Sequence, residues 1–271
     1  MFLDIIKAIT LGLVEGITEF LPISSTGHLI IVNKWLSFAP SFTVMFDVVI
    51  QLGAILAVIV VFWKKLWPFG KDEASKSTTL NVLSLHIWYK TILAVLPALV
   101  LGALFGSFIE EKLFNPLVVA VALILGGVVL IVIEKRRVAT PVKFTSEISY
   151  RTAFLIGLFQ CLAMVPGTSR AAATIIGAML LGASRVVAVE FSFFLAIPTM
   201  LAATAYSLLK YNASIGISEV IILGVGFMAA FFTALAVIKF LLNYIQNNNF
   251  KAFGYYRIGL GVLILLFFTI L

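Results

Sequence analysis

Long apolar runs separated by short polar segments dominate the chain. A helix that crosses a membrane needs roughly 20 apolar residues, and the runs between charged positions predict six such helices. Only helices and closed barrels satisfy their backbone polar groups inside lipid, and the alternating ten-residue strands of a barrel are absent. We therefore predict an all-α polytopic membrane protein, forming one domain over residues 1–271. The predicted spans are approximately 44–63, 86–108, 115–133, 186–209, 219–242 and 254–271.

Two further apolar regions, 2–33 and 152–183, are broken near their middle by proline, glycine and hydroxyl residues. Each is about 32 residues long, which is too long for one span and barely enough for two. Hydrophobic segments broken by proline or glycine, in matching positions of two halves, are typical of discontinuous helices around a binding site. We expect both regions to form re-entrant helical hairpins.

The two broken regions resemble each other. Residues 12–15 (Gly-Leu-Val-Glu) match 157–160 (Gly-Leu-Phe-Gln), and with one residue of slack Ser25 matches Ser169. Chance similarity between apolar segments is the alternative, but an internal duplication explains more of the pattern. The predicted repeats are approximately 2–108 and 152–242.

The distribution of basic residues predicts an inverted orientation of the two repeats. Segments 64–90 and 134–151 are rich in lysine and arginine, whereas 109–114 contains two glutamates and one lysine. The positive-inside rule places the two basic segments in the cytoplasm. The first hairpin then enters the membrane from outside and the second from the cytoplasm, both termini lie outside, and the hairpin tips meet near the membrane middle.

Composition supports the membrane assignment and removes other classes. The chain is 62% hydrophobic and 11% charged, whereas a soluble domain carries about 25% charged residues. The net charge of +7 suits loops that face anionic lipid, and nothing indicates nucleic acid as a partner. The single cysteine, Cys161, excludes an internal disulfide bond.

The first broken region carries unusual chemistry for an apolar segment. Glu15 and Glu19 are four residues apart and share one helix face. Ionisable residues at this depth indicate function by default, although exposure at the membrane surface is an alternative. Two close carboxylates need a shared proton, a metal ion or a cationic partner.

Hydroxyl groups and an imidazole follow the two carboxylates. Ser24, Ser25, Thr26 and His28 provide candidates for an activated nucleophile and a proton donor. Serines also cap helices, and both roles can coexist at one helix start.

The second broken region provides the countercharge. Gly167, Thr168, Ser169 and Arg170 precede a helix of small residues. Free backbone N–H groups at a helix start attract phosphate oxygens, and arginine is a bidentate donor to phosphate. A purely structural pairing of Arg170 with Glu15 or Glu19 is the alternative. Asp47, Gln51 and Glu190 are polar residues of the following spans that we expect to support the site.

Residues 15–28 (EGITEFLPISSTGH) and 166–170 (PGTSR) closely resemble the bacterial undecaprenyl-pyrophosphate phosphatase family, also called bacitracin-resistance proteins. The resemblance covers essentially the whole chain. It departs from the family pattern at Ala171, where many members have serine. Thr174 fits the later threonine of the family.

The resemblance implies hydrolysis of undecaprenyl pyrophosphate to undecaprenyl phosphate and inorganic phosphate. This reaction recycles the lipid carrier for peptidoglycan synthesis and protects against bacitracin. The resemblance also implies dependence on a divalent metal, a place in the bacterial cytoplasmic membrane and a site that opens to the periplasmic or outer face.

Combined with the residues themselves, the resemblance assigns roles. We expect Glu15 and Glu19 to hold Mg²⁺ or Ca²⁺, Ser25 to attack phosphorus or position water, and His28 to shuttle the proton. His28 as the nucleophile is the alternative. Arg170 stabilises developing charge. The residues expected to bind the pyrophosphate are Ser24, Thr26, Gly167, Thr168, Ser169, Arg170 and Thr174.

A transporter that flips a prenyl phosphate without hydrolysis is the second hypothesis, because inverted repeats with broken helices are typical of alternating access. Flipping in addition to hydrolysis is also open. The clustered hydroxyls and histidine favour catalysis, since transport alone needs no nucleophile. The expected partners are the polyprenyl pyrophosphate lipid and the bilayer, and the sequence leaves monomer and homodimer open.

Overall fold

The computed structural model describes residues 1–71, 78–135, 142–210 and 215–270. Within these ranges, six helices are long and apolar enough to cross a membrane. Each overlaps one of the six spans that the sequence predicts, so the all-α polytopic architecture is confirmed. The six helices are α3 (Pro40–Val61), α5 (Val82–Leu113), α6 (Pro116–Lys135), α9 (Arg185–Lys210), α10 (Ile217–Asn247) and α11 (Lys251–Ile270).

The two broken regions each form a pair of shorter helices. The first pair is α1 (Phe2–Thr18) and α2 (Ser25–Leu36), joined by a turn at the proline. The second pair is α7 (Tyr150–Gln160) and α8 (Arg170–Leu180), joined through the 3₁₀ turn η2 (Cys161–Met164). The members of each pair pack against each other.

Short elements occupy the connections. The helical turn α4 (Trp63–Leu66) leads into an antiparallel ribbon of β1 (Phe69–Lys71) and β2 (Thr78–Leu80), and η1 (Thr145–Glu147) precedes α7. Helix α5 begins before the predicted position 86, because the Asn81 side chain accepts a hydrogen bond from the Ser84 N–H and caps the helix. Three basic residues of the predicted cytoplasmic segments, Lys76, Arg136 and Arg137, lie outside the described residues.

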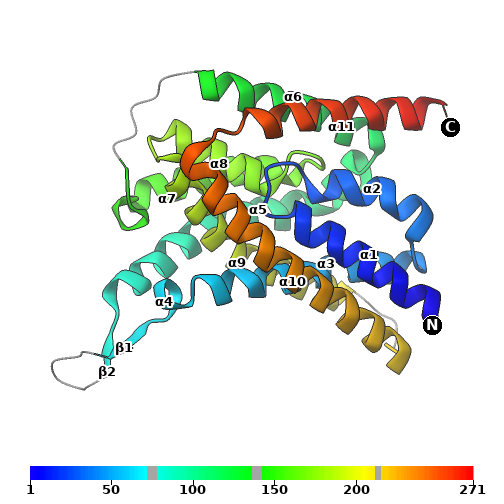
Figure 1. Ribbon diagram of the computed structural model, residues 1–271, viewed down its shortest axis with the longest axis horizontal. Coiled ribbons are helices and arrows are strands. Elements are labelled where there is room, and N and C mark those ends of the chain that lie inside the picture. The colour runs from blue at the N-terminus through cyan, green and yellow to red at the C-terminus, as the bar shows by residue number, and fades with distance from the viewer. Residues whose placement is uncertain (72–77, 136–141, 211–214, 271) are drawn as a thin grey trace.

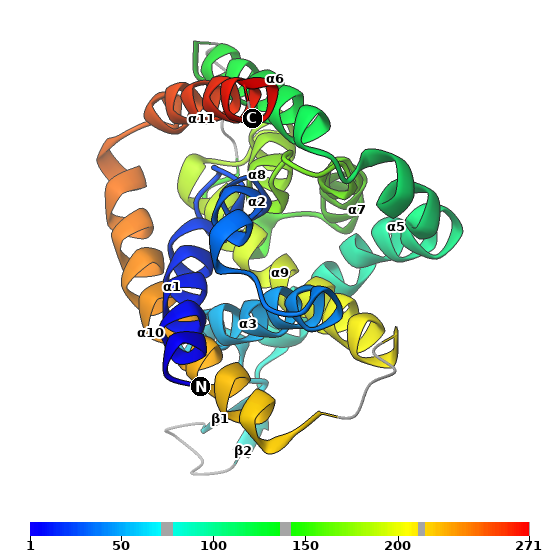
Figure 2. The same ribbon diagram turned by 90° about the vertical axis from the view of Figure 1, so that its right-hand side faces the viewer.

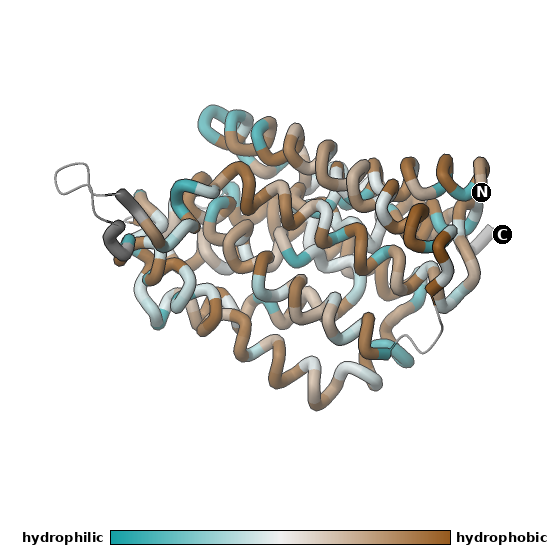
Figure 3. The backbone as a smooth tube through the Cα atoms, turned by 90° about the horizontal axis from the view of Figure 1, so that it is seen from below, coloured by the Kyte–Doolittle hydropathy of each residue, from teal (hydrophilic) through white to brown (hydrophobic). Residues whose placement is uncertain are grey.

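The two hairpins open toward opposite ends of the molecule (Figure 1). The α1–α2 pair opens toward the end where both termini lie, and α7 starts at the end where the β ribbon lies. Viewed along the long axis, the hairpins and the long helix α9 lie toward the middle, and α5, α6, α10 and α11 lie toward the outside (Figure 2). Hydrophobic positions dominate the long helices (Figure 3), while polar side chains such as Glu15 and Thr174 are buried inside the molecule.

The long helices interlock the two halves of the chain. Helix α10 packs along α1 and α3 of the first half, whereas α5 packs along α7 and α9 of the second half. Glycines allow these close contacts: a Cβ on Gly12 would overlap the Gly226 carbonyl of α10, and one on Gly157 would overlap the Ala94 carbonyl of α5. Neither hairpin is therefore enclosed by its own half alone.

The order of elements repeats along the chain: a hairpin is followed by three long helices, first α3, α5 and α6, then α9, α10 and α11. The duplication stays a prediction, and this order would extend it to α6 and α11, which lie beyond the predicted repeats. Helices α6 and α11 pack against each other, α6 also packs against α2 and α8, and α11 also packs against α2.

Candidate active site at the hairpin tips

Both hairpin tips end in a serine of the same unusual conformation. Ser24 has φ 71° and Ser169 has φ 69°, and they are the two non-glycine residues with positive φ in the described part of the chain. Each is the N-cap of the returning helix: Ser24 Oγ accepts from the Gly27 N–H and Ser169 Oγ from the Ala172 N–H, both at 3.2 Å. Left-handed backbone is costly for serine and is found where the surroundings enforce it, often at functional sites.

This geometry corrects the residue match between the hairpins. The sequence comparison paired Ser25 with Ser169 by allowing a one-residue gap in the alignment. In the structure, the residue equivalent to Ser169 is Ser24. Without slack, Ser25 corresponds to Arg170 and Glu15 to Gln160. The equivalent positions therefore carry different chemistry on the two hairpins.

A continuous polar chain joins the two tips. The Ser25 hydroxyl donates to Glu19 Oε2 at 2.7 Å, and Arg170 Nη2 donates to Glu19 Oε1 at 3.0 Å. All three side chains are buried or nearly so. A buried ion pair needs further hydrogen bonds to offset its desolvation, and the Ser25 hydroxyl provides one to the carboxylate.

Helix α9 holds the other side of the arginine. Arg170 Nη1 donates to the Ser192 carbonyl at 2.8 Å, and the Ser192 hydroxyl lies 2.6 Å from that of Thr174. Arg170 Nε is buried and has no hydrogen-bond partner in the structure. A buried donor without a partner is costly, so this N–H is free to bind an anion.

Glu15 lies in the first tip without any hydrogen bond. Its side chain is fully buried and neither carboxylate oxygen has a partner. It interacts electrostatically with Glu19, Asp47 and Arg170. Asp47, on α3, accepts a hydrogen bond from Asn33 of α2 at 2.7 Å. Of the two carboxylates that the sequence placed on one helix face, Glu19 is therefore hydrogen-bonded and Glu15 is not.

His28 lies beside the tip but does not pair with Ser25, as the expected proton shuttle would. Its Nδ1 lies 2.7 Å from the Ser24 carbonyl and its Nε2 lies 2.7 Å from the Tyr256 hydroxyl of α11. A carbonyl oxygen only accepts, so Nδ1 carries the proton, and in the neutral imidazole Nε2 accepts from Tyr256. The two rings are stacked.

The remaining predicted pyrophosphate residues lie at the two helix starts. Thr26 is in the first turn of α2, and the Thr168 N–H donates to the Val165 carbonyl in the second tip. Gly167 has φ +91°, and a Cβ there would overlap the Val119 carbonyl of α6, so only glycine fits this turn.

Glu190 does not support the site, although the sequence analysis expected it to. Its carboxylate binds Lys65 Nζ at 2.8 and 3.0 Å and the Thr145 hydroxyl at 2.7 Å. Lys65 is half exposed, so this pair lies at the edge of the molecule. Arg185, at the start of α9, forms an ion pair with Glu134 at the end of α6.

Sequence reasoning missed three residues at the tips: Ser192, Tyr256 and Arg257. Arg257 carried a usable signal, since it is a charged residue within a predicted span, and such residues indicate function. Ser192 and Tyr256 carried none, because single hydroxyl residues are common in apolar helices.

The carboxylates also allow a test of the expected metal. The unpartnered oxygens of Glu15 fit a hard cation such as Mg²⁺ or Ca²⁺. Glu19 has less capacity, because both of its oxygens already accept hydrogen bonds. No group of three or more acidic, histidine or cysteine side chains within the described ranges is arranged to hold a metal ion. Glu15 is thus the primary candidate ligand and Glu19 a shared one.

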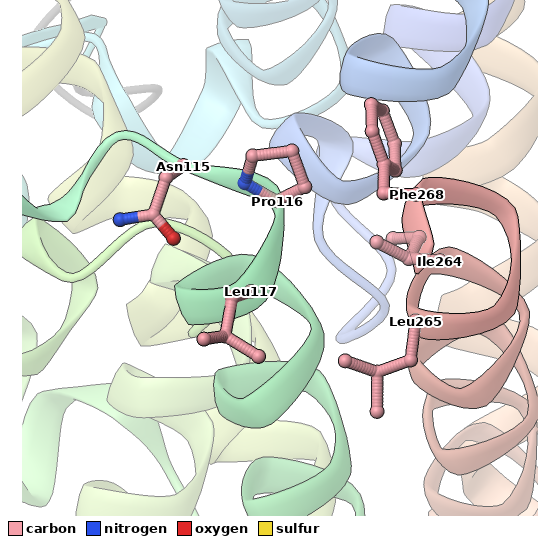
Figure 4. Close-up of a pocket in the computed structure, with 6 residues that line it drawn as sticks. All are labelled: Asn115, Pro116, Leu117, Ile264, Leu265 and Phe268. Atoms are coloured by element: carbon pink, nitrogen blue, oxygen red, sulfur yellow. The ribbon is translucent and has the colours of Figure 1, made fainter. Parts of the chain in front are cut away.

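A pocket of about 390 Å³ lies between the start of α6 and helix α11 (Figure 4). None of its lining residues belongs to the tip cluster and most are apolar, so it is not the reaction site. The lining residues are Asn115, Pro116, Leu117, Ile264, Leu265 and Phe268.

The chain matches known proteins along almost its entire length. It is 51% identical to "Undecaprenyl-diphosphatase" of Lachnoclostridium phytofermentans, over 99% of this chain and 98% of that protein. It is 50% identical to the protein of the same name from Enterococcus faecalis, over 98% of this chain and 97% of that protein. It is 51% identical to "Undecaprenyl-diphosphatase 1" of Clostridioides difficile, over 99% and 98%. The model of the bacitracin resistance protein BacA family matches residues 8–263, and the chain belongs to this family.

Proposed function

We propose that this protein hydrolyses undecaprenyl pyrophosphate to undecaprenyl phosphate and inorganic phosphate, and thereby confers bacitracin resistance. One observation carries the proposal: Glu19 joins the Ser25 hydroxyl of the first hairpin to the Arg170 guanidinium of the second. A nucleophile, a base and a cation thus meet in one buried site. The family and the names of the relatives support the same reaction.

The second tip binds the pyrophosphate in this proposal. Arg170 Nε is free to donate, and it lies at the start of α8, where a helix N-terminus attracts phosphate oxygens. The Ala172 N–H of this helix already donates to Ser169 Oγ. Charge that develops on the transferred phosphoryl oxygens is stabilised there, which is the main requirement of phosphoryl transfer. Ser192 accepts a hydrogen bond from Arg170 Nη1, and Thr174 donates to the Arg170 carbonyl and is hydrogen-bonded to Ser192, so both residues fix the position of the arginine.

The first tip supplies the nucleophile. The Ser25 oxygen attacks the terminal phosphorus, its proton passes to Glu19, and the bond to the bridging oxygen breaks to release undecaprenyl phosphate. Water then attacks the phosphoserine, which releases inorganic phosphate and returns the proton to Ser25. Direct attack by water held between Ser25 and Glu19 is the alternative route, and the response to loss of Ser25 separates them.

A divalent cation completes the proposed site. Glu15 would hold it together with Glu19, and when bound it would neutralise charge on the pyrophosphate oxygens. Within the protein itself, Glu15 lies close enough to Glu19 and Arg170 to interact with both electrostatically.

The orientation in the bacterial cytoplasmic membrane follows from charge. The end with the β ribbon carries the basic segments, and both termini lie at the other end (Figure 1). The positive-inside rule then puts the termini outside. The first hairpin opens to the outer face, where it admits the pyrophosphate headgroup, and it is re-entrant in this arrangement.

The test is phosphate release from a C55 or C15 prenyl pyrophosphate by purified protein in detergent, with and without EDTA. We expect metal-dependent release by the wild type and none by Arg170→Ala. Because detergent removes any gradient, release establishes hydrolysis independent of transport.

The opposed hairpins also favour a second activity, movement of the lipid phosphate across the membrane. Wild-type protein that binds prenyl phosphate but releases no phosphate would leave transport as the function. Release together with transbilayer movement in vesicles would show that both occur.

A further inference from the structure

Arg257 of α11 is a fully buried cation without a carboxylate partner among the described residues. Burial of an arginine is costly unless its donors are satisfied. Here the guanidinium donates to backbone carbonyl groups alone. Its charge is therefore balanced by carbonyl dipoles of the protein backbone.

The carbonyl partners come from three different elements. Two belong to α6, Leu123 at 3.3 Å and Ala122 at 3.2 Å. The other two are the turns of the two hairpins: Pro22 at 3.2 Å in the first tip and Gly167 at 3.1 Å in the second. One side chain thus ties both tips to each other and to a long helix.

The sequence positions of the two tip carbonyls connect this residue to the chemistry. Pro22 lies midway between Glu19 and Ser25, and Gly167 precedes Arg170 by three residues. A change in the position of either carbonyl therefore shifts Ser25 and Glu19 relative to Arg170. Arg257 itself donates its hydrogen bonds to backbone carbonyl groups and not to the side chains of Glu19, Ser25 or Arg170.

Helix α6 makes room for the guanidinium. A Cβ on Gly126 would overlap Arg257 Nη2 and lie 2.8 Å from its Cζ. Glycine at this position leaves space for the guanidinium beside α6 while it reaches both turns. The glycine therefore offers a way to displace the arginine without removing its charge.

We infer that Arg257 is a positioning residue, which fixes the separation of the two hairpin tips and so aligns Ser25 and Glu19 with Arg170. The inference rests on the proposed phosphatase function. A purely structural role would lower stability alone, whereas a positioning role lowers turnover of the folded enzyme. Misplacement of reacting groups by about 1 Å costs on the order of 100-fold in rate.

The experiment measures kcat, KM and thermal stability of Arg257→Gln and Arg257→Lys beside the wild type, well below the melting temperature. For Arg257→Gln we expect kcat to fall about 100-fold with KM nearly unchanged. Arg257→Lys keeps the charge and part of the hydrogen bonding, so we expect it to recover much of the loss. Gly126→Ala, which keeps the arginine and displaces it, should lower kcat in the same direction.

Two comparisons make the result decisive. Arg185→Gln breaks the Arg185–Glu134 pair away from the tips, so it should lower stability and leave kcat unchanged. In a double-mutant cycle with Arg170→Lys, the Arg257→Gln loss should shrink, because both act on one alignment. Where Arg257→Gln does not fold, Gly126→Ala and Arg257→Lys provide the same cycle.

Wild-type kcat in folded Arg257→Gln or Gly126→Ala would overturn the inference, as would losses that multiply independently in the cycle. Absence of phosphate release from the wild type is a different result. It would overturn the proposed function, and the inference with it.

Discussion

The two hairpins have the same backbone conformation at their turns but carry side chains of opposite charge. Both turn through a cap serine near φ 70°, and both pack a glycine of the outgoing helix against a long helix from the other half. The residue after the cap is Ser25 in one and Arg170 in the other, and the equivalents Glu15 and Gln160 are both buried. A repeated frame fixes where the side chains lie, while the residue at each equivalent position decides which hairpin provides the base and which the cation.

Removal of the cation from the second hairpin should have the largest effect on activity. Arg170→Ala should lower kcat/KM by about 1,000-fold or more, because preorganised donors that stabilise developing charge usually contribute most to catalysis. It also leaves Glu19 buried without its cation, which destabilises the tip. Phosphate release and thermal melting measure the two effects, with Arg185→Ala as the control that removes an arginine outside the site. Activity near wild type would show that the second hairpin binds no pyrophosphate.

Removal of the nucleophile tests the other hairpin. Ser25→Ala should reduce phosphate release by at least about 100-fold if Ser25 forms the covalent intermediate. The contribution of the helix caps is measured separately: Ser24→Ala removes a cap and should cost about 1 kcal/mol of stability, as should Ser169→Ala in the other hairpin. Near-normal release by Ser25→Ala would rule out the phosphoserine route and leave direct attack by water.

Glu15→Gln gives the first hairpin the amide that the second has at the equivalent position. We expect activity to fall about 10-fold or more and affinity for Mg²⁺ or Ca²⁺ to fall with it, since a charged ligand is lost. Titration calorimetry with the metal alone reads binding without activity. Stability should not fall, because a buried carboxylate without a partner is removed. Unchanged metal affinity would remove Glu15 from the metal site.

Gln160→Glu, which gives the second hairpin the carboxylate of the first, should have the smallest effect on activity. Gln160 accepts a hydrogen bond from Thr199 at 3.2 Å and its Nε2 has no partner. Gln160→Glu adds a buried carboxylate to the second hairpin and should lower the melting temperature by about 3 °C or more, with kcat within about threefold. A large loss of kcat at unchanged stability would instead mean that Gln160 contacts the substrate.

Much of the architecture could be predicted from the sequence because it depends on local properties. Apolar runs of about 20 residues must form helices in lipid, and all six expected spans are helices in the structure. Proline and glycine interrupt hydrogen bonding within a helix, so the breaks near Pro22 and Pro166 were also visible. The polar residues at both breaks could be singled out because charge in an apolar segment is costly and therefore rarely accidental.

The pairing of those residues was decided by the tertiary structure. From the sequence, Glu15 and Glu19 were equally good partners for Arg170. In the packed structure, Arg170 forms its ion pair with Glu19, and the Glu15 carboxylate has no hydrogen-bond partner. Glu190 had the same sequence signal as Asp47, yet Lys65 and Thr145 hold it at the edge. Tyr256 and Arg257 reach the tips from a helix more than 80 residues away in the chain. Helix formation depends on neighbours in sequence, whereas hydrogen bonds and ion pairs depend on distances of about 3 Å that only the packed helices set.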